Sequence, residues 1–258
     1  MNSEFYTPLQ MREVFHLEFL RWFGRKVTAD TYALKGGVNL RLFFKSIRYS
    51  EDMDIDIQRV RVDKIQKTVM DILTARGFSD SLKFFGIEKV VPPDITKAKQ
   101  TETTQRFKIH LMTSSGEDLF TKIEFSRRGL KGTSIVEPAT AQILRPYKMA
   151  PLLVSHYDTP SAIAQKIQAL AQRSVVQARD ILDLHVLSSQ YSQEQKSIKL
   201  DDDVVKTANN NIFLIDFPQF RDTVVAYLGV DDQKAYSSSA VWDEIKLKVS
   251  DFLEEFNA

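Results

Sequence analysis

Residues 48–57 have the sequence Arg-Tyr-Ser-Glu-Asp-Met-Asp-Ile-Asp-Ile, and they are among the most informative in the chain. From Asp52 onward, acidic and apolar residues alternate strictly, which predicts a β-strand with one acidic and one apolar face. At a rise of ~3.3 Å per residue, the Cα atoms of Asp52 and Asp54 lie ~6.6 Å apart on one face, and Asp56 follows on that face. Like charges in a row repel, so such a face is explained by solvent exposure or by divalent cations between the carboxylates. Two magnesium ions ~3.5 to 4 Å apart would suit phosphoryl or nucleotidyl transfer.

The residues before this strand predict a glycine turn that opens a helix. Residues 31–34 suit a short strand, Gly36 and Gly37 interrupt it, and residues 38–44 suit a helix. Backbone N–H groups at such a turn can bind phosphates. A calcium loop of the EF-hand type is excluded because its sixth and twelfth positions hold Ile57 and Asp63 instead of Gly and Glu.

The rest of the chain predicts an α/β (α+β) domain followed by an all-helical domain. Residues 60–77 favour a helix that stops at Gly77, and residues 107–111 and 123–125 favour a strand hairpin. Glu124 on this hairpin is a candidate third carboxylate, although acids on solvated strand faces are common. The domain boundary is expected between Pro138 and Pro160, and the sequence beyond it predicts helices. Thr159 suits the N-cap and Pro160 the first turn of one helix, and Val175 is expected on the apolar face of the next. We therefore expect domains at 1–150 and 151–258, the second closing the active-site cleft.

Composition narrows the class of protein. The 258 residues are 43% hydrophobic and 27% charged, which is typical of a folded globular chain, and the absence of cysteine excludes disulfides and thiolate metal sites. No signal sequence and no membrane-spanning segment is recognisable, so we expect a cytoplasmic protein. Residues 121–180 carry 9 basic and 4 acidic side chains. This excess is compatible with a polyanionic substrate, although a solvated mixed surface is the commoner cause.

A second group of charges lies in the helical part. Lys166 and Arg173 are two helical turns apart, so both could reach a triphosphate or an RNA backbone. Asp180 and Asp183 also share a helix face. Arg179 and Asp183 are four residues apart, so an ordinary ion pair within the helix is an alternative explanation for them. The signatures of serine hydrolases, P-loop proteins and Rossmann folds do not occur, and the four histidines show no metal-ligand spacing.

Taken together and in order, these motifs resemble the AbiEii/AbiGii (MenT-type) toxin family of nucleotidyltransferases, within the DNA polymerase β-like superfamily. The resemblance covers residues 15–190. It is carried by four motifs, which are Lys35-Gly36-Gly37-Val38-Asn39-Leu40-Arg41, Arg48-x-Ser50-x-Asp52-x-Asp54, Lys166-x-x-Ala169-Leu170-x-x-Arg173 and Arg179-Asp180-x-x-Asp183-Leu184.

The resemblance implies a polymerase β-like mixed sheet and a set of site residues. It implies Mg²⁺ or Mn²⁺ on Asp52 and Asp54, and catalytic roles for these two residues and for Lys166 and Asp180. Glu124 stays a further metal candidate because of its place on the hairpin. The nucleotide-binding residues that we expect are Gly36, Gly37, Arg48, Ser50, Lys166 and Arg173. Many family members have Thr or Ser where this chain has Val38, and Ala where it has Asn39.

The resemblance also implies a function. Such proteins transfer a nucleotide from an NTP, in several cases to the 3′ end of tRNA, and act as toxins of type IV-like toxin–antitoxin (abortive infection) systems with a partner antitoxin. Two alternatives remain open. One is a catalytically silent nucleotide- or antitoxin-binding protein with the same fold, and the other is an RNA-binding module that uses no nucleotide.

Overall fold

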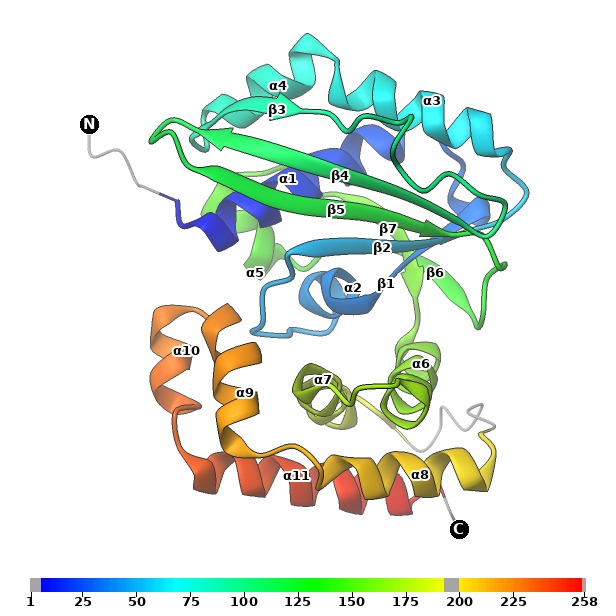
Figure 1. Cartoon of the computed structure of the whole chain (residues 1–258), viewed down its shortest axis with the longest axis vertical. Coiled ribbons are helices and arrows are strands. Elements are labelled where there is room, and N and C mark those ends of the chain that lie inside the picture. The colour runs from blue at the N-terminus through cyan, green and yellow to red at the C-terminus, as the bar shows by residue number, and fades with distance from the viewer. Residues whose placement is uncertain (1–5, 193–199, 257–258) are drawn as a thin grey trace. The chain divides into compact units, whose positions relative to one another are not determined.

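The alternating stretch forms strand β2 (Asp52–Ile57) in the computed structural model, which describes residues 6–192 and 200–256. Within those residues, one sheet contains seven strands in the order β3-β4-β5-β2-β1-β7-β6, so β2 lies in the middle (Figure 1). β2 pairs parallel to β5 and antiparallel to β1, which makes the sheet mixed. The predicted α/β fold class is confirmed.

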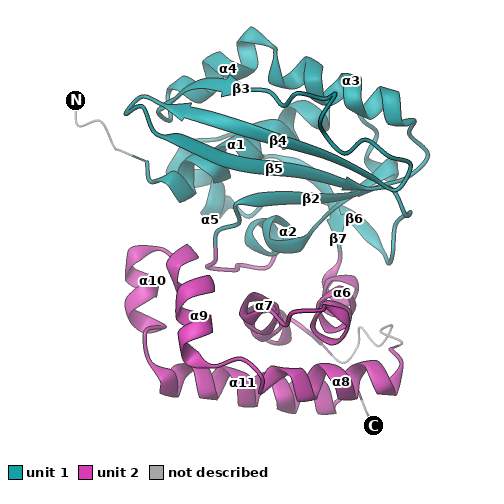
Figure 2. Ribbon diagram, in the orientation of Figure 1, with its two compact units in different colours: residues 1–43, 49–157 teal, residues 44–48, 158–258 magenta. Residues whose placement is uncertain are grey.

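The chain divides into two compact units, residues 1–43 with 49–157 and residues 44–48 with 158–258 (Figure 2). The first unit extends past residue 150, where the sequence placed the domain boundary, because β7 (Leu153–Tyr157) pairs with β1 and β6. The remaining elements of the first unit, in chain order, are α1 (Pro8–Phe23), η1 (Ala29–Thr31), β1 (Tyr32–Lys35), α2 (Gly36–Phe43), α3 (Val62–Leu73), α4 (Arg76–Lys83), β3 (Ile87–Val91), β4 (Thr104–Thr113), β5 (Asp118–Ser126), β6 (Ser134–Pro138), α5 (Ala141–Leu144) and η2 (Arg145–Tyr147).

Helix α1 packs between the sheet and α4. Thr7 caps its N-terminus in a capping box with Gln10. The ring of Phe23 lies 5.5 Å from that of Phe125 on β5, and the ring of Phe15 lies 5.8 Å from that of Phe78 on α4. All four rings are fully buried, and they belong to one apolar core. The inward face of the sheet is thereby covered, and its acidic residues Asp52 and Asp54 are left on the other face.

Every described element of the second unit after residue 158 is helical, as the sequence predicts. These elements are α6 (Thr159–Gln172), α7 (Ala178–Ser188), α8 (Asp202–Ile212), α9 (Phe217–Thr223), η4 (Val225–Tyr227), α10 (Val230–Ala235) and α11 (Ser239–Glu254). Trp242 of α11 stacks on Phe220 of α9 with ring centroids 4.2 Å apart and donates its indole N–H to the carbonyl oxygen of Ile215. This fully buried pair forms part of the core of the helical unit.

Three local expectations were wrong. Gly77 does not end a helix over residues 60–77, because α3 ends at Leu73 and Gly77 lies inside α4. The cap of α6 is Asp158, whose carboxylate accepts from the backbone N–H of Ser161, so Thr159 is the first helical residue. Val175 precedes α7 and is exposed, so it does not belong to the apolar face of that helix.

No helix in the described ranges 6–192 and 200–256 is both long and apolar enough to cross a membrane.

Candidate active site

The acidic side chains of β2 face a lysine and a glutamate on the neighbouring strand. Asp52 is in register with Lys122 of β5, and Asp54 with Glu124. The Nζ atom of Lys122 lies 3.1 Å from Oδ2 of Asp52 and 4.0 Å from Oε2 of Glu124. The sheet thus brings together the three carboxylates that the sequence nominated as metal ligands, with an ammonium group among them.

Asp54 lies directly against the glycine turn that precedes α2. Gly36 has φ +67°, a left-handed conformation that favours glycine, and a Cβ atom there would lie 3.0 Å from Oδ2 of Asp54. Burial raises the pKa of Asp54, Glu124 and Asp52 raise it further, and Lys35 and Lys122 oppose this shift. A carboxylate in such surroundings gains from a bound cation, because the cation stabilises its charged form.

Asp56 does not share the open acidic face that the alternation predicts. It is only 3% exposed. Lys35 Nζ lies 2.5 Å from its Oδ1, and the Tyr157 hydroxyl donates to its Oδ2 at 2.7 Å. Burial and this bond to a carboxylate raise the pKa of Tyr157. Both oxygens of Asp56 are therefore engaged inside the sheet, and its role is to hold β1, β2 and β7 together.

Glu124 is paired with an arginine from β4. Arg106 Nε donates to its Oε2 at 2.7 Å, the same oxygen that lies nearest to Lys122. A metal ion on this oxygen would have to replace or tolerate two cations. The geometry therefore favours Asp52 and Asp54 over Glu124 as ligands.

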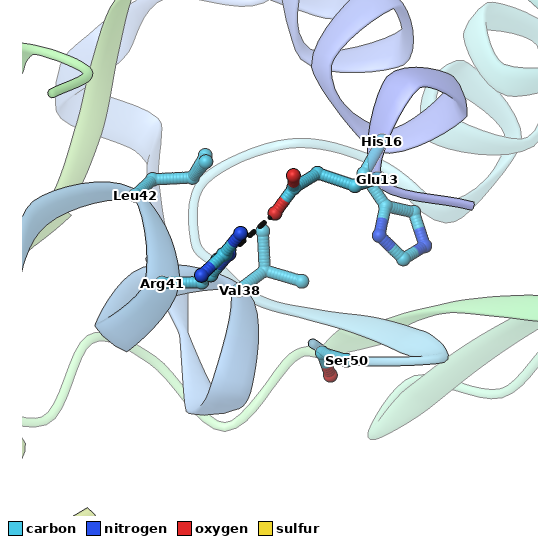
Figure 3. A pocket seen from close by; sticks show the side chains of 6 residues that line it. All are labelled: Glu13, His16, Val38, Arg41, Leu42 and Ser50. Atoms are coloured by element: carbon cyan, nitrogen blue, oxygen red, sulfur yellow. Dashed lines mark hydrogen bonds and ion pairs between the residues drawn. The ribbon is translucent and has the colours of Figure 1, made fainter. Parts of the chain in front are cut away.

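Ser50 fixes the start of β2 and lines a small cavity. Its hydroxyl donates to the carbonyl oxygen of Asp52 at 2.8 Å. The cavity has a volume of about 10 Å³, which is room for about one water molecule (Figure 3). The residues that line it are Glu13, His16, Val38, Arg41, Leu42 and Ser50.

A buried network beside this cavity was missed by the sequence analysis. Arg41 Nε donates to Oε1 of Glu13 at 2.7 Å, as Figure 3 shows, and the Tyr147 hydroxyl donates to Oε2 at 2.6 Å. The Arg41 guanidinium also lies 4.2 Å from the ring centroid of Tyr49, next to Ser50. Arg41 belongs to the glycine-turn motif, but nothing in the sequence pairs it with Glu13 and Tyr147, which lie far away along the chain. The network anchors α2 and the chain that leads into β2.

The departures at Val38 and Asn39 lie inside the first unit. Both side chains are buried, and the Asn39 amide donates to the carbonyl oxygen of Tyr157 at 3.2 Å. Gly37, Val38 and Asn39 all belong to the first turn of α2. Asn39 therefore ties this turn to strand β7.

The second unit gathers the other nominated residues into a buried ion cluster. Lys166 Nζ lies 2.9 Å from Oδ1 of Asp180 and 2.6 Å from Oδ2 of Asp183. Arg173 Nε lies 3.1 Å from Oδ2 of Asp180, and Arg48 Nη2 lies 3.2 Å from Oδ2 of Asp183. Both aspartates are fully buried. Asp183 pairs with Lys166 and Arg48, and Arg179 forms no ion pair with it within the described part of the chain.

Two members of this cluster, Asp183 and Lys166, have pKa values shifted in favour of their charged forms. Burial alone would raise the pKa of Asp183, but Arg48 and Lys166 outweigh it and hold that pKa below its usual value. Burial likewise disfavours the Lys166 ammonium, but Asp183 and Asp180 outweigh it and the repulsion from Arg48, and raise the pKa of Lys166. The charges of Asp183 and Lys166 are therefore maintained by their partners.

The nominated residues thus form two groups, each inside one unit. Gly36, Gly37, Ser50, Asp52, Asp54 and Glu124 belong to the first unit, and Arg48, Lys166, Arg173 and Asp180 belong to the second. Arg48 belongs to the second because it bonds Asp183, and because Gln190 donates to the carbonyl oxygen of Phe44 at 2.5 Å. The position of Arg48 along the chain, close to Ser50 and Asp52, did not predict that it belongs to the second unit.

The first group has the donor chemistry for a magnesium ion. Mg²⁺ in nucleotide enzymes is typically held by one or two carboxylates together with substrate phosphates. Asp52 and Asp54 supply two carboxylates, and Gly36, which has no Cβ atom, lies directly against one of them. No group of three or more acidic or histidine side chains within residues 6–192 and 200–256 is arranged to hold a metal by itself. A site completed by nucleotide phosphates agrees with both observations.

Comparisons with known proteins agree with the fold and identify the family. The family described as nucleotidyl transferase AbiEii toxin, type IV toxin–antitoxin system, matches residues 19–233. MenT4, a nucleotidyltransferase toxin from Mycobacterium tuberculosis H37Rv, is similar in structure, with TM-score 0.60, 16% identity, and coverage of 96% of this chain and 84% of that one. JHP933 from Helicobacter pylori is similar with TM-score 0.57, 18% identity, and coverage of 98% and 93%. No sequence among curated proteins matches.

At these identities the solved structures establish the fold, and the family match establishes membership. The motifs that suggested the family lie within or next to the matched residues, and the predicted enzyme class, a nucleotidyltransferase, is confirmed. The chain belongs to the nucleotidyl transferase AbiEii toxin family of type IV toxin–antitoxin systems.

Proposed function

We propose that this nucleotidyltransferase moves a nucleoside monophosphate from an NTP to an acceptor hydroxyl, and that the acceptor is RNA, such as the 3′ end of a tRNA. The observation that carries the proposal is the pair Asp52 and Asp54 on the open face of β2, with Gly36 against Asp54. Two carboxylates beside a glycine turn suit a metal-bound triphosphate. The family adds an NTP substrate and a cognate antitoxin.

In the reaction, the acceptor oxygen forms a bond to the α-phosphorus, the bond between the α- and β-phosphates breaks, and pyrophosphate leaves with the electron pair. The hydroxyl proton passes to a base or to water. A magnesium or manganese ion held by Asp52 and Asp54 would offset the charge of the triphosphate. The backbone of Gly36 and Gly37 would approach the phosphates, and Ser50 would hold the start of β2 in place through its bond to Asp52.

We assign Lys166 to the triphosphate and Asp180 to an essential acid role on the resemblance alone, with Arg48 and Arg173 as further nucleotide-binding residues. Their buried pairing with one another supports a fixed set of charges. The closing of the second unit over the site stays a prediction.

The Asp52→Asn variant, compared with wild type, distinguishes nucleotidyl transfer from the function of a catalytically silent binding protein. The asparagine would keep the size of the side chain but lose the charge, so transfer of label from α-labelled NTP to total tRNA should fall at least about 100-fold, since the metal would lose a ligand. Wild-type protein that binds NTP in the presence of magnesium but yields no product with any NTP or acceptor would support the silent binding protein instead. Unchanged transfer by Asp52→Asn would refute the metal assignment.

A protein that binds RNA without nucleotide is the third possibility. It predicts strongly salt-dependent tRNA affinity that Asp52→Asn leaves unchanged, and no affinity for NTP. An NTP titration by calorimetry with and without magnesium distinguishes it from both other functions.

A further inference from the structure

The open face of β4 and β5 carries a row of charged side chains that continues the row on β2. Arg106, Lys108 and His110 alternate with the buried residues Phe107 and Ile109 along β4. Arg106 is in register with Glu124, and Lys108 with Lys122, which are themselves in register with Asp54 and Asp52. Because side chains of paired residues lie on one face of a sheet, the basic side chains of β4 lie on the same face as the two candidate catalytic acids.

An open pocket of about 440 Å³ lies over this part of β4. One side is the strand itself, and the other is the connection from β3, which contains the pair Pro92-Pro93. Five side chains in its lining can carry positive charge, against the single acid Asp94, and these five are Lys97, Lys99, Arg106, Lys108 and His110. We call it the β4 pocket. Its charge is complementary to a polyanion.

Two of these charges have no acidic partner in the described residues. Lys97 pairs with Asp94 at 3.5 Å, Arg106 pairs with Glu124, and His110 Nδ1 lies 3.1 Å from Oδ2 of Asp118. Lys99 and Lys108 are exposed and form no ion pair with any acid in residues 6–192 or 200–256. Uncompensated lysines on one face are free to neutralise phosphates, which is the main source of affinity for nucleic acids.

An exposed aromatic ring lies beside the β4 pocket. Phe120 of β5 is 57% exposed, and its ring lies 4.4 Å from that of His110, at 62°. Arg12 Nε donates to the carbonyl oxygen of Phe120 at 2.8 Å, which holds this end of β5. An exposed ring next to a basic groove is the combination by which proteins bind single-stranded nucleic acid, because a base can stack on the ring while phosphates meet the lysines.

We infer that the β4 pocket and Phe120 bind a single-stranded segment of the acceptor RNA, next to its reacting end. The inference rests on the proposed function, since it names where that acceptor lies. The aromatic ring favours RNA over an acidic peptide, since it offers a stacking surface for a base. The position on the same face as Asp52 and Asp54 favours the acceptor over a remote ligand.

The test measures RNA and NTP binding separately. Binding of a labelled single-stranded RNA of about ten nucleotides is followed by fluorescence anisotropy for wild type and for the double variant Lys99→Ala/Lys108→Ala. We expect the affinity of the double variant to fall at least about tenfold, and the slope of log affinity against log salt to decrease by about 1.4, for two phosphate contacts at ~0.7 each. Magnesium-dependent NTP binding should stay as in wild type.

The matched control is Lys64→Ala/Lys67→Ala on α3, which removes two exposed lysines from another element of the same unit. It should leave RNA affinity within about twofold. For the aromatic ring, Phe120→Ala should weaken RNA binding at least about fivefold, and Phe120→Tyr should restore it, since tyrosine offers the same stacking surface.

An equal loss of RNA affinity in the double variant and its control would overturn the inference. So would unchanged RNA affinity in both variants, or a wild-type protein that binds no RNA. Failure of the proposed function gives a different pattern. If RNA binding depends on Lys99 and Lys108 but no NTP is used, the β4 pocket binds RNA and nucleotidyl transfer is refuted. If NTP label reaches an acceptor equally well in both lysine variants, transfer stands and the inference is refuted.

Discussion

Gly36 and Asp54 lie so close that a Cβ atom on Gly36 would be 3.0 Å from Oδ2 of Asp54. The two residues come from α2 and β2, which the pairing of Lys35 with Asp54 across β1 and β2 brings together. Two features favour glycine at this position. Its φ is +67°, which side chains with a Cβ atom rarely adopt, and the Asp54 carboxylate lies against the place that a Cβ atom would take. This contact couples the glycine motif to the acidic strand.

Gly36→Ala should therefore weaken metal binding as well as stability. We expect a loss of about 1 to 3 kcal/mol in the free energy of unfolding from the left-handed backbone, and at least about tenfold weaker Mn²⁺ binding because Asp54 is displaced. Urea denaturation and calorimetry with Mn²⁺ measure the two effects.

Gly116→Ala is the matched control, since Gly116 has φ +83° with nothing within 4 Å of a Cβ atom. It should lose similar stability and keep Mn²⁺ affinity; equal Mn²⁺ losses in both variants would refute the contact as the cause.

Lys122 should compete with the metal for Asp52. Its ammonium lies 3.1 Å from Oδ2 of that carboxylate, which is 44% exposed. Removing the charge in Lys122→Gln should tighten Mn²⁺ binding to the nucleotide-free protein by about fivefold, or ~1 kcal/mol, given the partial exposure of the pair. Calorimetry measures this, with Lys64→Gln on α3 as the control that should change nothing. Weaker Mn²⁺ binding in Lys122→Gln would mean that the lysine supports the site and does not compete for it.

Asp183→Ala should be strongly destabilising, because it would leave the Lys166 ammonium and the Arg48 guanidinium buried with one carboxylate fewer. Lys166 and Arg48 have side chains only 11% and 8% exposed. Breaking a buried pair in this way costs about 3 to 5 kcal/mol. Urea denaturation provides the value. Glu244→Ala, which removes the partner of Lys248 in an exposed pair on α11, should change stability by less than about 0.5 kcal/mol. Comparable costs at the two positions would show that the cluster is not held as a buried unit.

His16 should make the protein less stable as the pH falls from about 6.5 toward 3. Burial, followed by the charge of Arg12, lowers the pKa of His16 from 6.5 to about 3. The Thr121 hydroxyl donates to the carbonyl oxygen of Glu51, so it accepts from Nε2 of His16 at 2.9 Å. In this pH range the unfolded chain binds a proton that the folded chain does not, so stability falls by up to ~1.4 kcal/mol per pH unit.

His16→Gln removes that proton uptake. The difference in free energy of unfolding between wild type and His16→Gln should therefore shrink by about 2 to 3 kcal/mol between pH 7 and pH 4.5, as measured by urea denaturation at both values. A difference that is the same at both pH values would contradict the neutral, buried state of His16.

The sequence predicts those parts of the site whose residues are close along the chain. The alternation in β2, the glycine turn and the β4–β5 hairpin depend on local periodicity, and the structure contains all of them. The fate of Asp56 could not be predicted, because its partners lie 21 and 101 residues away. The end of α3 could not be predicted either, because it lies at Leu73, where no glycine stops the helix, and Gly77 lies inside the following helix α4.

The same limit applies to the second unit. The spacing of Lys166 and Arg173 predicts a shared helix face. Arg173 is instead the extended C-cap residue just after α6, although both side chains do contact Asp180. That Arg48 bonds Asp183 could not be inferred, because the two residues are 135 positions apart and Arg48 ends a short segment, residues 44–48, that lies between two stretches of the first unit. Ion pairs between residues far apart along the chain depend on how the chain folds, so the local periodicity of the sequence does not predict them.

Nucleotidyl transfer can be observed by incubating the protein with magnesium, total tRNA and each NTP in two labelled forms, at the α- and at the γ-phosphate, with Asp52→Asn beside the wild type. Nucleotidyl transfer predicts that the α-label of at least one NTP appears on RNA, that the γ-label leaves as pyrophosphate, and that Asp52→Asn does neither. A γ-label on RNA, or an α-label that reaches RNA equally well in Asp52→Asn, would contradict the account.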